Sequence, residues 1–141
     1  MNLLTEENSE HIKCFMVVYA LEQELCNLVQ RSAITHEDAK KYSKEYPGLS
    51  LQNNNEDPKS LIRSCTFRNI LYLTKDFLHG TSMHTHLVEL VKIVEDLKII
   101  GIRNDFSHAT KGSVGSWQWH RCAALACDPV IVSLEFTEVY R

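Results

Sequence analysis

Apolar residues recur at three- and four-residue steps through most of the chain, which is the period of an amphipathic helix. The first such segment follows Thr5 and is expected to end near Arg31. A shorter, charged helix is expected to start at the capping pattern Thr35-His-Glu-Asp38 and to end before Pro47. The first segment takes its apolar positions from Ile12, Phe15, Met16, Tyr19, Cys26 and Val29.

The middle of the chain predicts two longer helices. Asp57-Pro58 combines a capping residue with a proline at the first helical position, and the helix that it starts should end at Gly80. Ser82 is expected to cap the next helix. Its stripe of Leu and Val continues through Gly101, where another helix could approach closely, to Asn104 and His108.

The last part of the chain predicts two shorter elements. Trp117 to Ala126 has a helical pattern, with Trp119, Cys122, Ala123 and Ala126 packing inward. Asp128-Pro129 can start a final short helix, although the β-branched residues between Val130 and Tyr140 also fit a strand. The stretches 49–56 and 110–116 have loop chemistry. We therefore expect one domain over residues 1–141, an all-α bundle of five or six helices.

Composition narrows the class of protein. No apolar run approaches the roughly 18 residues that a membrane span needs, and no signal pattern opens the chain. The five cysteines form no Cys-x-x-Cys pair and fall at apolar positions, which favours core packing and reduced thiols. These features predict a cytoplasmic protein without a membrane segment. The cluster His79, His84 and His86 lacks a carboxylate or cysteine at ligand spacing, so we expect neither a metal nor another cofactor.

Chemistry is concentrated in the stretch that ends Ile102-Arg103-Asn104-Asp105-Phe106-Ser107-His108. The Arg103 guanidinium suits a phosphate or carboxylate, and the His108 imidazole can exchange a proton near neutral pH. Asn104 precedes His108 by one helical turn and could orient the imidazole. Arg103 and His108 are five positions apart, roughly 140° around an ideal helix, so they converge only if the helix bends or ends, or if a second copy supplies the complement.

A structural interpretation of the same residues stays open. In it, Arg103 forms a surface ion pair and His108 is a satisfied interior histidine. The pair Arg68-Asn69 gives an internal comparison, because the position five residues after Arg68 is Leu73 and not histidine.

The net charge of −3 argues against binding nucleic acid by bulk electrostatics. Residues 98–121 nevertheless carry a formal +3, which leaves −6 for the rest of the chain.

The motif Arg103-Asn104-x-x-x-His108, following a long apolar helix in a small all-α chain, resembles that of the HEPN superfamily. The resemblance implies a HEPN-like bundle of about five helices that dimerises, so that two motifs meet in one cleft. It also implies a metal-independent endoribonuclease acting on RNA, with toxin-antitoxin or antiviral-defence roles. Arg103 would then stabilise charge on phosphorus, His108 would transfer protons, and Asn104 would orient them. A protein antitoxin or another regulator would be a possible partner.

Two residues depart from that pattern, and a second family shares part of the motif. The HEPN subgroup that is paired with small nucleotidyltransferases carries a tyrosine two residues after the histidine, where this chain has Thr110. Asp105 places a negative charge beside the proposed phosphate site. Ile102-Arg103-Asn104-x-Phe106-x-His108 also resembles the motif of mannitol-repressor-like helical proteins, which regulate by binding. The alternative to a nuclease is therefore a non-catalytic interaction or regulatory module of the same fold.

Overall fold

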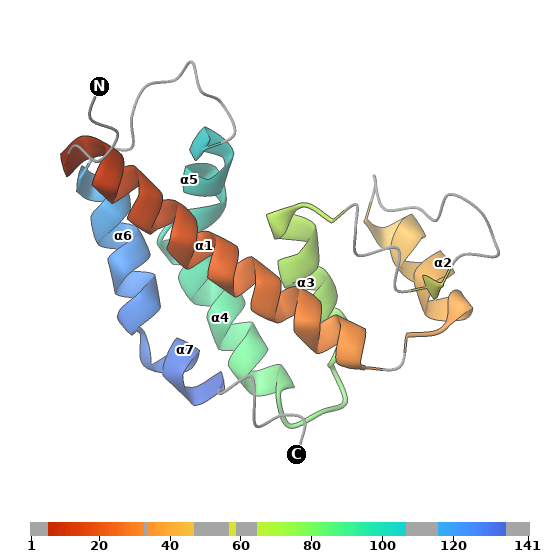
Figure 1. The fold of residues 1–141 in the computed structure, drawn as a ribbon. Coiled ribbons are helices and arrows are strands. Elements are labelled where there is room, and N and C mark those ends of the chain that lie inside the picture. The colour runs from red at the N-terminus through yellow and green to blue at the C-terminus, as the bar shows by residue number, and fades with distance from the viewer. Residues whose placement is uncertain (1–5, 33, 47–56, 59–64, 107–115, 135–141) are drawn as a thin grey trace.

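The computed structural model describes residues 6–32, 34–46, 57–58, 65–106 and 116–134, and within these ranges it contains seven helices and no strand. The predicted all-α class is confirmed, with more helices than the five or six expected. Figure 1 labels them in chain order. They are α1 (Glu6–Arg31), α2 (His36–Glu45), α3 (Phe67–Phe77), α4 (His84–Asp96), α5 (Ile99–Phe106), α6 (Ser116–Cys127) and α7 (Pro129–Leu134).

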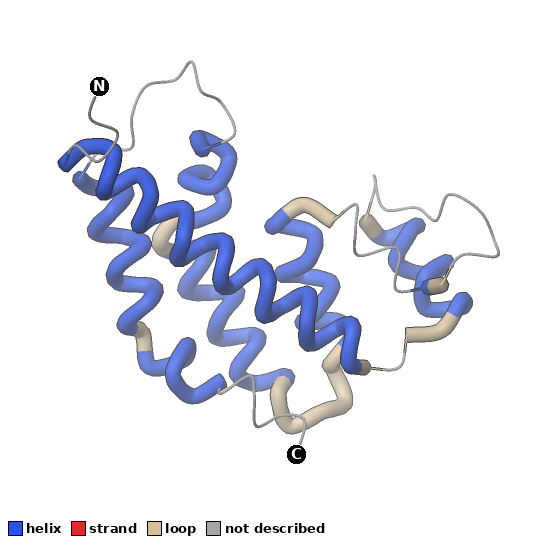
Figure 2. Tube along the Cα trace, in the orientation of Figure 1, coloured by secondary structure: helices blue, strands red, loops and turns tan. Residues whose placement is uncertain are grey.

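The long helix α1 crosses one side of the bundle and packs against α3, α5 and α6. Behind it, α4 contacts α3, α5 and α7, so that α1 and α4 form the centre of the molecule. Figure 2 shows the same arrangement, with the short α2 beyond the end of α1. No helix in the described part of the chain is long and apolar enough to cross a membrane.

The core is aliphatic and draws on most of the helices. Fully burying one such side chain stabilises the fold by about 1.5–3 kcal/mol. Thr74 is buried among these residues and donates its hydroxyl to the carbonyl oxygen of Ile70 at 2.6 Å, so it leaves no unsatisfied group. The largest fully buried side chains are Leu25, Leu28, Ile70, Leu71, Leu73, Leu87, Leu90, Ile99, Ile102 and Leu125.

Helix α1 has the predicted length but not the predicted buried face. Only Val29 and, in part, Cys26 of the expected stripe are buried, whereas Ile12, Phe15, Met16 and Tyr19 are exposed. The core face consists instead of Cys14, Val18, Leu21, Leu25, Leu28 and Val29. The first half of α1 is apolar on both faces, so its periodicity could not identify the inner one.

The capping box predicted for the second helix is confirmed. The Asp38 N–H donates to Thr35 Oγ1 at 3.1 Å, and the Thr35 N–H donates to Asp38 Oδ2 at 3.0 Å. These two bonds satisfy backbone donors that a helix start otherwise leaves without partners. Ala39 and Tyr42 then fix α2 to the rest of the bundle through one buried face.

The single helix expected from Asp57 to Gly80 is wrong in its first part. Cys65 and Thr66 are not helical, and α3 begins at Phe67 behind an extended Thr66 whose side chain accepts the Asn69 N–H at 3.2 Å. Our prediction placed Thr66 inside the helix. Threonine is favoured instead as an N-cap, because its side-chain oxygen accepts hydrogen bonds from backbone donors. Residues 59–64 lie outside the described ranges.

The long helix expected from Ser82 to His108 is divided in two. Met83, not Ser82, is the N-cap of α4, without a side-chain cap bond. The chain then breaks at Lys98, whose φ of 59° is the left-handed conformation that costs a residue with a Cβ about 1–2 kcal/mol. Gly101 was expected to allow close helix approach, but among the described residues nothing lies within 4 Å of where its Cβ would be.

The C-terminal helices largely match the prediction. In α6, Cys122 is buried and Trp119 is partly buried, but Ala126 is exposed, contrary to expectation. Asp128 caps α7 by accepting the Val130 N–H at 2.9 Å, so residues 129–134 form a helix and the alternative of a strand there is wrong. The predicted loop 49–56, residues 110–115 of the predicted loop 110–116 and the stretch 135–140 lie outside the described ranges. Ser116, expected in that loop, is the first residue of α6.

Candidate functional site

The end of α5 carries two of the three predicted site residues. Ile99 and Ile102 are buried and anchor this short helix on the core. Arg103 follows Ile102 and is half-buried, and Asn104 is exposed. We had expected Asn104 to continue the buried stripe of α4. It does not, because the break at Lys98 turns α5 to a new orientation.

Arg103 is held by an acidic residue of another helix. Its Nε atom lies 3.7 Å from Glu22 Oε2 on α1, and the two side chains are 29% and 17% exposed. At this distance and exposure the pair contributes at most about 1 kcal/mol to stability. The ion pair of the structural interpretation is thus present. It also fixes the position of the guanidinium, which a binding site for an anion would require.

His108 lies outside the described residues. The backbone of α5 is helical to Phe106, and the described side chains of this helix end at Asn104. The structure thus brings Arg103 and Asn104 to one helix end. The convergence of Arg103 with His108 stays a prediction from the sequence.

A second cation of this region has a structural task. Arg121 Nη1 donates to the carbonyl oxygen of Leu97 at 3.1 Å, where α4 ends. A cation there satisfies a terminal carbonyl and complements the negative end of the helix dipole. Its guanidinium also stacks over the Trp117 ring at 5.2 Å. Of the formal +3 in this part of the sequence, one charge therefore stabilises the turn that orients α5.

The comparison pair Arg68-Asn69 occupies the opposite kind of position, the first turn of α3. The Asn69 N–H is taken up by the Thr66 cap, and the Arg68 guanidinium lies over the Tyr72 ring at 5.9 Å. Leu73, at the position that corresponds to His108, is fully buried. This pair is therefore part of a helix start and of the core.

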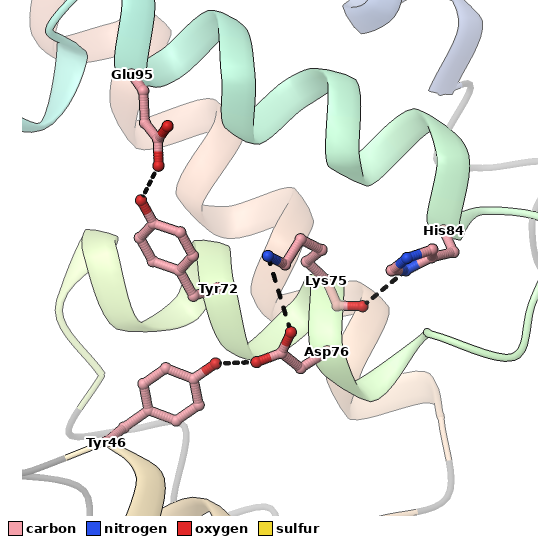
Figure 3. Close-up of polar contacts among 6 residues, drawn as sticks. All are labelled: Tyr46, Tyr72, Lys75, Asp76, His84 and Glu95. Atoms are coloured by element: carbon pink, nitrogen blue, oxygen red, sulfur yellow. Dashed lines mark hydrogen bonds and ion pairs between the residues drawn. The ribbon is translucent and has the colours of Figure 1, made fainter.

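A hollow of about 460 Å³ adjoins this pair, lined by Glu45, Tyr46, Arg68, Asn69 and Tyr72. Figure 3 shows that its two tyrosines are tied to carboxylates of α3 and α4. Tyr46 donates its hydroxyl to Asp76, and Tyr72 donates to Glu95. The sequence analysis missed this cluster, because no local spacing connects Tyr46 with a carboxylate thirty residues later.

The tyrosines of this cluster stay protonated at neutral pH. Burial and the hydrogen bond to Asp76 raise the pKa of Tyr46, and the hydrogen bond to Glu95 raises the pKa of Tyr72. The hollow thus offers fixed hydrogen-bond donors and aromatic faces, and its tyrosines are neither bases nor nucleophiles. Neither tyrosine can therefore serve as the base that phosphodiester cleavage requires.

The histidine cluster is structural in its described contacts. The rings of His79 and His84 meet edge to face at 4.6 Å, and His84 Nδ1 lies 3.2 Å from the carbonyl oxygen of Lys75. That hydrogen bond, drawn in Figure 3, ties the start of α4 to α3. Within the described ranges, no group of three His, Cys, Asp or Glu side chains could hold a metal ion.

The cysteines are free thiols, and their environments differ from the uniform core positions that we expected. Cys14 and Cys122 are buried, but Cys127 is exposed and Cys65 lies outside a helix. Burial, followed by the neighbouring Cys14, raises the pKa of Cys122 to about 12. Such a thiol is protonated at neutral pH and therefore unreactive.

Searches with this chain against protein-family models, curated proteins and solved structures found no match. The functional interpretation therefore depends on the residues themselves. The end of α5 combines a positioned cation with an exposed amide and leads directly into the sequence that contains His108. The hollow beside α3 has an aromatic and polar lining, and its two tyrosines are held protonated by hydrogen bonds to carboxylates.

Proposed function

We propose that this protein is a metal-independent endoribonuclease of the HEPN type, acting as a homodimer. One observation carries the proposal: the Arg103 guanidinium is fixed by Glu22 at the end of a helix that is anchored on the core, next to the exposed amide of Asn104. A positioned cation with an adjacent polar side chain suits a phosphate of RNA. His108, four residues after Asn104, is the proton-transfer group in this proposal.

The proposed chemistry is transfer of the phosphoryl group within RNA. The ribose 2′-oxygen forms a bond to phosphorus while the bond from phosphorus to the 5′-oxygen breaks. A base takes the 2′-hydroxyl proton, and an acid gives a proton to the departing 5′-oxygen, each contributing about 100- to 10,000-fold. The products are a 2′,3′-cyclic phosphate and a 5′-hydroxyl. A base and an acid on opposite sides of phosphorus require two histidines, which two copies of His108 would supply.

Arg103 would stabilise the charge that develops on the phosphoryl oxygens. In the free protein Glu22 already pairs with it, so the phosphate exchanges one anionic partner of Arg103 for another. An ion pair at 3.7 Å in a partly exposed setting is weak enough for such an exchange. Glu22 would thus keep the guanidinium in place between turnovers.

The test is incubation of labelled single-stranded RNA with the purified protein in excess EDTA. We expect the wild type to cleave and to leave 2′,3′-cyclic phosphate ends, and His108→Ala to lose at least about 100-fold in rate with unchanged helicity. Intact RNA with wild type, or equal cleavage by His108→Ala, would contradict the proposal. Cleavage that requires added metal would contradict its mechanism.

The Arg103–Glu22 pair also favours a second function, a non-catalytic interaction module of the same fold. An arginine that is already neutralised by a carboxylate needs no phosphate to be satisfied. In that case both wild type and His108→Ala leave RNA intact, and the substitution changes affinity for a partner protein. For either function, we propose that a partner protein, such as an antitoxin, binds this domain and restrains or uses it.

A further inference from the structure

The outer face of α1 is the most unusual surface of the described molecule. Four large side chains at three- and four-residue spacing form one stripe along it: Ile12, Phe15, Met16 and Tyr19. Met16 is 61% exposed, the highest value among the large hydrophobic side chains that the structure describes. The rings of Phe15 and Tyr19 stack at 5.6 Å, so the stripe has a defined shape. A helix segment that is apolar on both faces is normally covered on both.

The second half of the same helix is different. After Ala20, the exposed positions of α1 are Gln23, Gln30 and Arg31, which are polar, while the core face continues through Leu25 and Leu28. The apolar outer face is thus confined to residues 12–20. This restriction argues for a specific contact at that place and against a general tolerance of apolar residues on α1.

We propose that this stripe binds the same stripe of a second copy of the chain, in antiparallel orientation around a two-fold axis. The inference rests on the proposed function, because it names the surface that forms the dimer of that proposal. The partner copy would pack Ile12 against Tyr19 and Phe15 against Met16, since the axis would cross α1 between Phe15 and Met16. An isologous contact of this kind is the commonest way in which soluble chains dimerise.

The charge pattern fits a second copy. None of the four stripe residues has a formal charge, so two copies can meet without burying an unpaired ion. Lys13 lies at the edge and already contacts the Trp119 ring of its own chain at 5.7 Å. The interface would therefore have an apolar and aromatic centre with a charged margin, as protein interfaces do.

The area is that of an interface centre. At roughly 200 Å² for a large side chain, four half-exposed ones present on the order of 400 Å² per copy. A stable interface buries about 800 Å² per partner, so the stripe supplies about half and the margins of α1 and its neighbours supply the rest.

The same contact places the two candidate sites on one side. Glu22 follows Tyr19 by three residues, so Arg103 lies along one flank of the stripe. A two-fold axis perpendicular to α1 within the interface leaves both copies of α5 on the same flank of the paired helices. In Figure 1, α5 lies beside the first half of α1, against which it packs. This is the arrangement that a shared site needs.

The experiment measures mass in solution by light scattering for the whole chain, whose single-copy mass is 16.2 kDa. We expect the wild type to be a dimer, and Met16→Glu and Met16→Lys each to raise the dissociation constant by at least about 100-fold through like-charge repulsion near the axis. Mixing the two variants should restore the dimer. Val88→Glu is the matched control, because Val88 is an exposed hydrophobic residue on α4 and should leave the dimer intact.

Each outcome of this experiment either supports or overturns the proposed interface. A monomeric wild type, a dimer that Met16→Glu leaves unchanged, or no recovery on mixing would overturn the inference. RNA cleavage, measured on the same samples, separates it from the proposed function. A dimer that is broken by Met16→Glu but never cleaves RNA supports this interface and contradicts the nuclease, whereas a dimer that cleaves RNA and that Met16→Glu leaves intact does the reverse.

Discussion

The dipeptide Arg-Asn occurs twice in this chain, and the two copies show how position decides what a motif can do. Arg68-Asn69 stands in the first turn of α3, where Thr66 caps the helix and the arginine stacks on Tyr72. Arg103-Asn104 stands in the last turns of α5, where Glu22 of α1 pairs with the arginine. The first pair serves the start of a helix, whereas the second presents its polar groups where a helix ends.

The two pairs also differ at the position five residues after the arginine. After Arg68 it is Leu73, which is fully buried in the core. After Arg103 it is His108, which can transfer a proton near neutral pH. A shared dipeptide therefore carries no functional information until the surrounding helix and the following turn are known.

The largest effect on stability is expected at Leu73. Leu73→Ala removes a fully buried side chain and leaves a cavity, so the free energy of unfolding should fall by about 2–5 kcal/mol. Urea unfolding followed by circular dichroism measures this change. The exposed Asn104 gives the contrast, since Asn104→Ala should change the same quantity by less than about 0.5 kcal/mol. If both variants lost the same free energy of unfolding, the distinction between a first pair next to the core and a second pair at the surface would be contradicted.

A smaller effect is expected from alkaline pH in the region around the first pair. Burial and nearby carboxylates raise the pKa of Tyr42, on α2, to about 12, above the value of about 10 in the unfolded chain. The folded state thus holds this proton more tightly. The stability that it contributes is complete below pH 10 and is lost as the pH rises toward 12.

The variant Tyr42→Phe tests this pH dependence. It removes the titrating hydroxyl but keeps the ring that meets Phe77 edge to face. Thermal melts between pH 9 and 11 should show a shallower fall in midpoint for the variant than for the wild type. Parallel curves would show that Tyr42 has the same pKa in the folded and unfolded chain.

Only a small effect on stability is expected at Glu22, beside the second pair. Glu22→Gln keeps the shape of the side chain and removes its charge, so stability should fall by less than about 1 kcal/mol. Affinity for a short single-stranded RNA should rise, because the carboxylate no longer competes for Arg103. Fluorescence anisotropy measures this. Unchanged or weaker binding would indicate that Arg103 meets no phosphate.

Much of the fold could be predicted because its signals are local. The apolar period and the caps at Thr35 and Asp128 located α1, α2 and α7. One failure was local, the overlooked cap at Thr66, and others came from tertiary contacts. The break at Lys98 has no glycine or proline to announce it, and the Arg121 bond to the Leu97 carbonyl comes from a residue 24 positions away.

The candidate site was predictable to a similar degree. The sequence located Arg103 and Asn104 and raised the possibility of an ion pair, but it could not name Glu22 as the partner, because α1 and α5 are far apart in the chain. Nor could it choose the inner face of α1, since Ile12 and Met16 follow the same period as Cys14 and Val18. Apolar periodicity identifies a helix, and only packing identifies its covered side.

The most direct test compares the two arginines in one assay. Arg103→Ala and Arg68→Ala remove the same charge from the same chain, and the contacts with Glu22 and with the Tyr72 ring are both partly exposed. Single-turnover cleavage of labelled RNA in EDTA should slow by at least about 100-fold for Arg103→Ala and by less than about threefold for Arg68→Ala. Equal rates for the two variants, or a larger loss for Arg68→Ala, would contradict the assignment of the site to the end of α5.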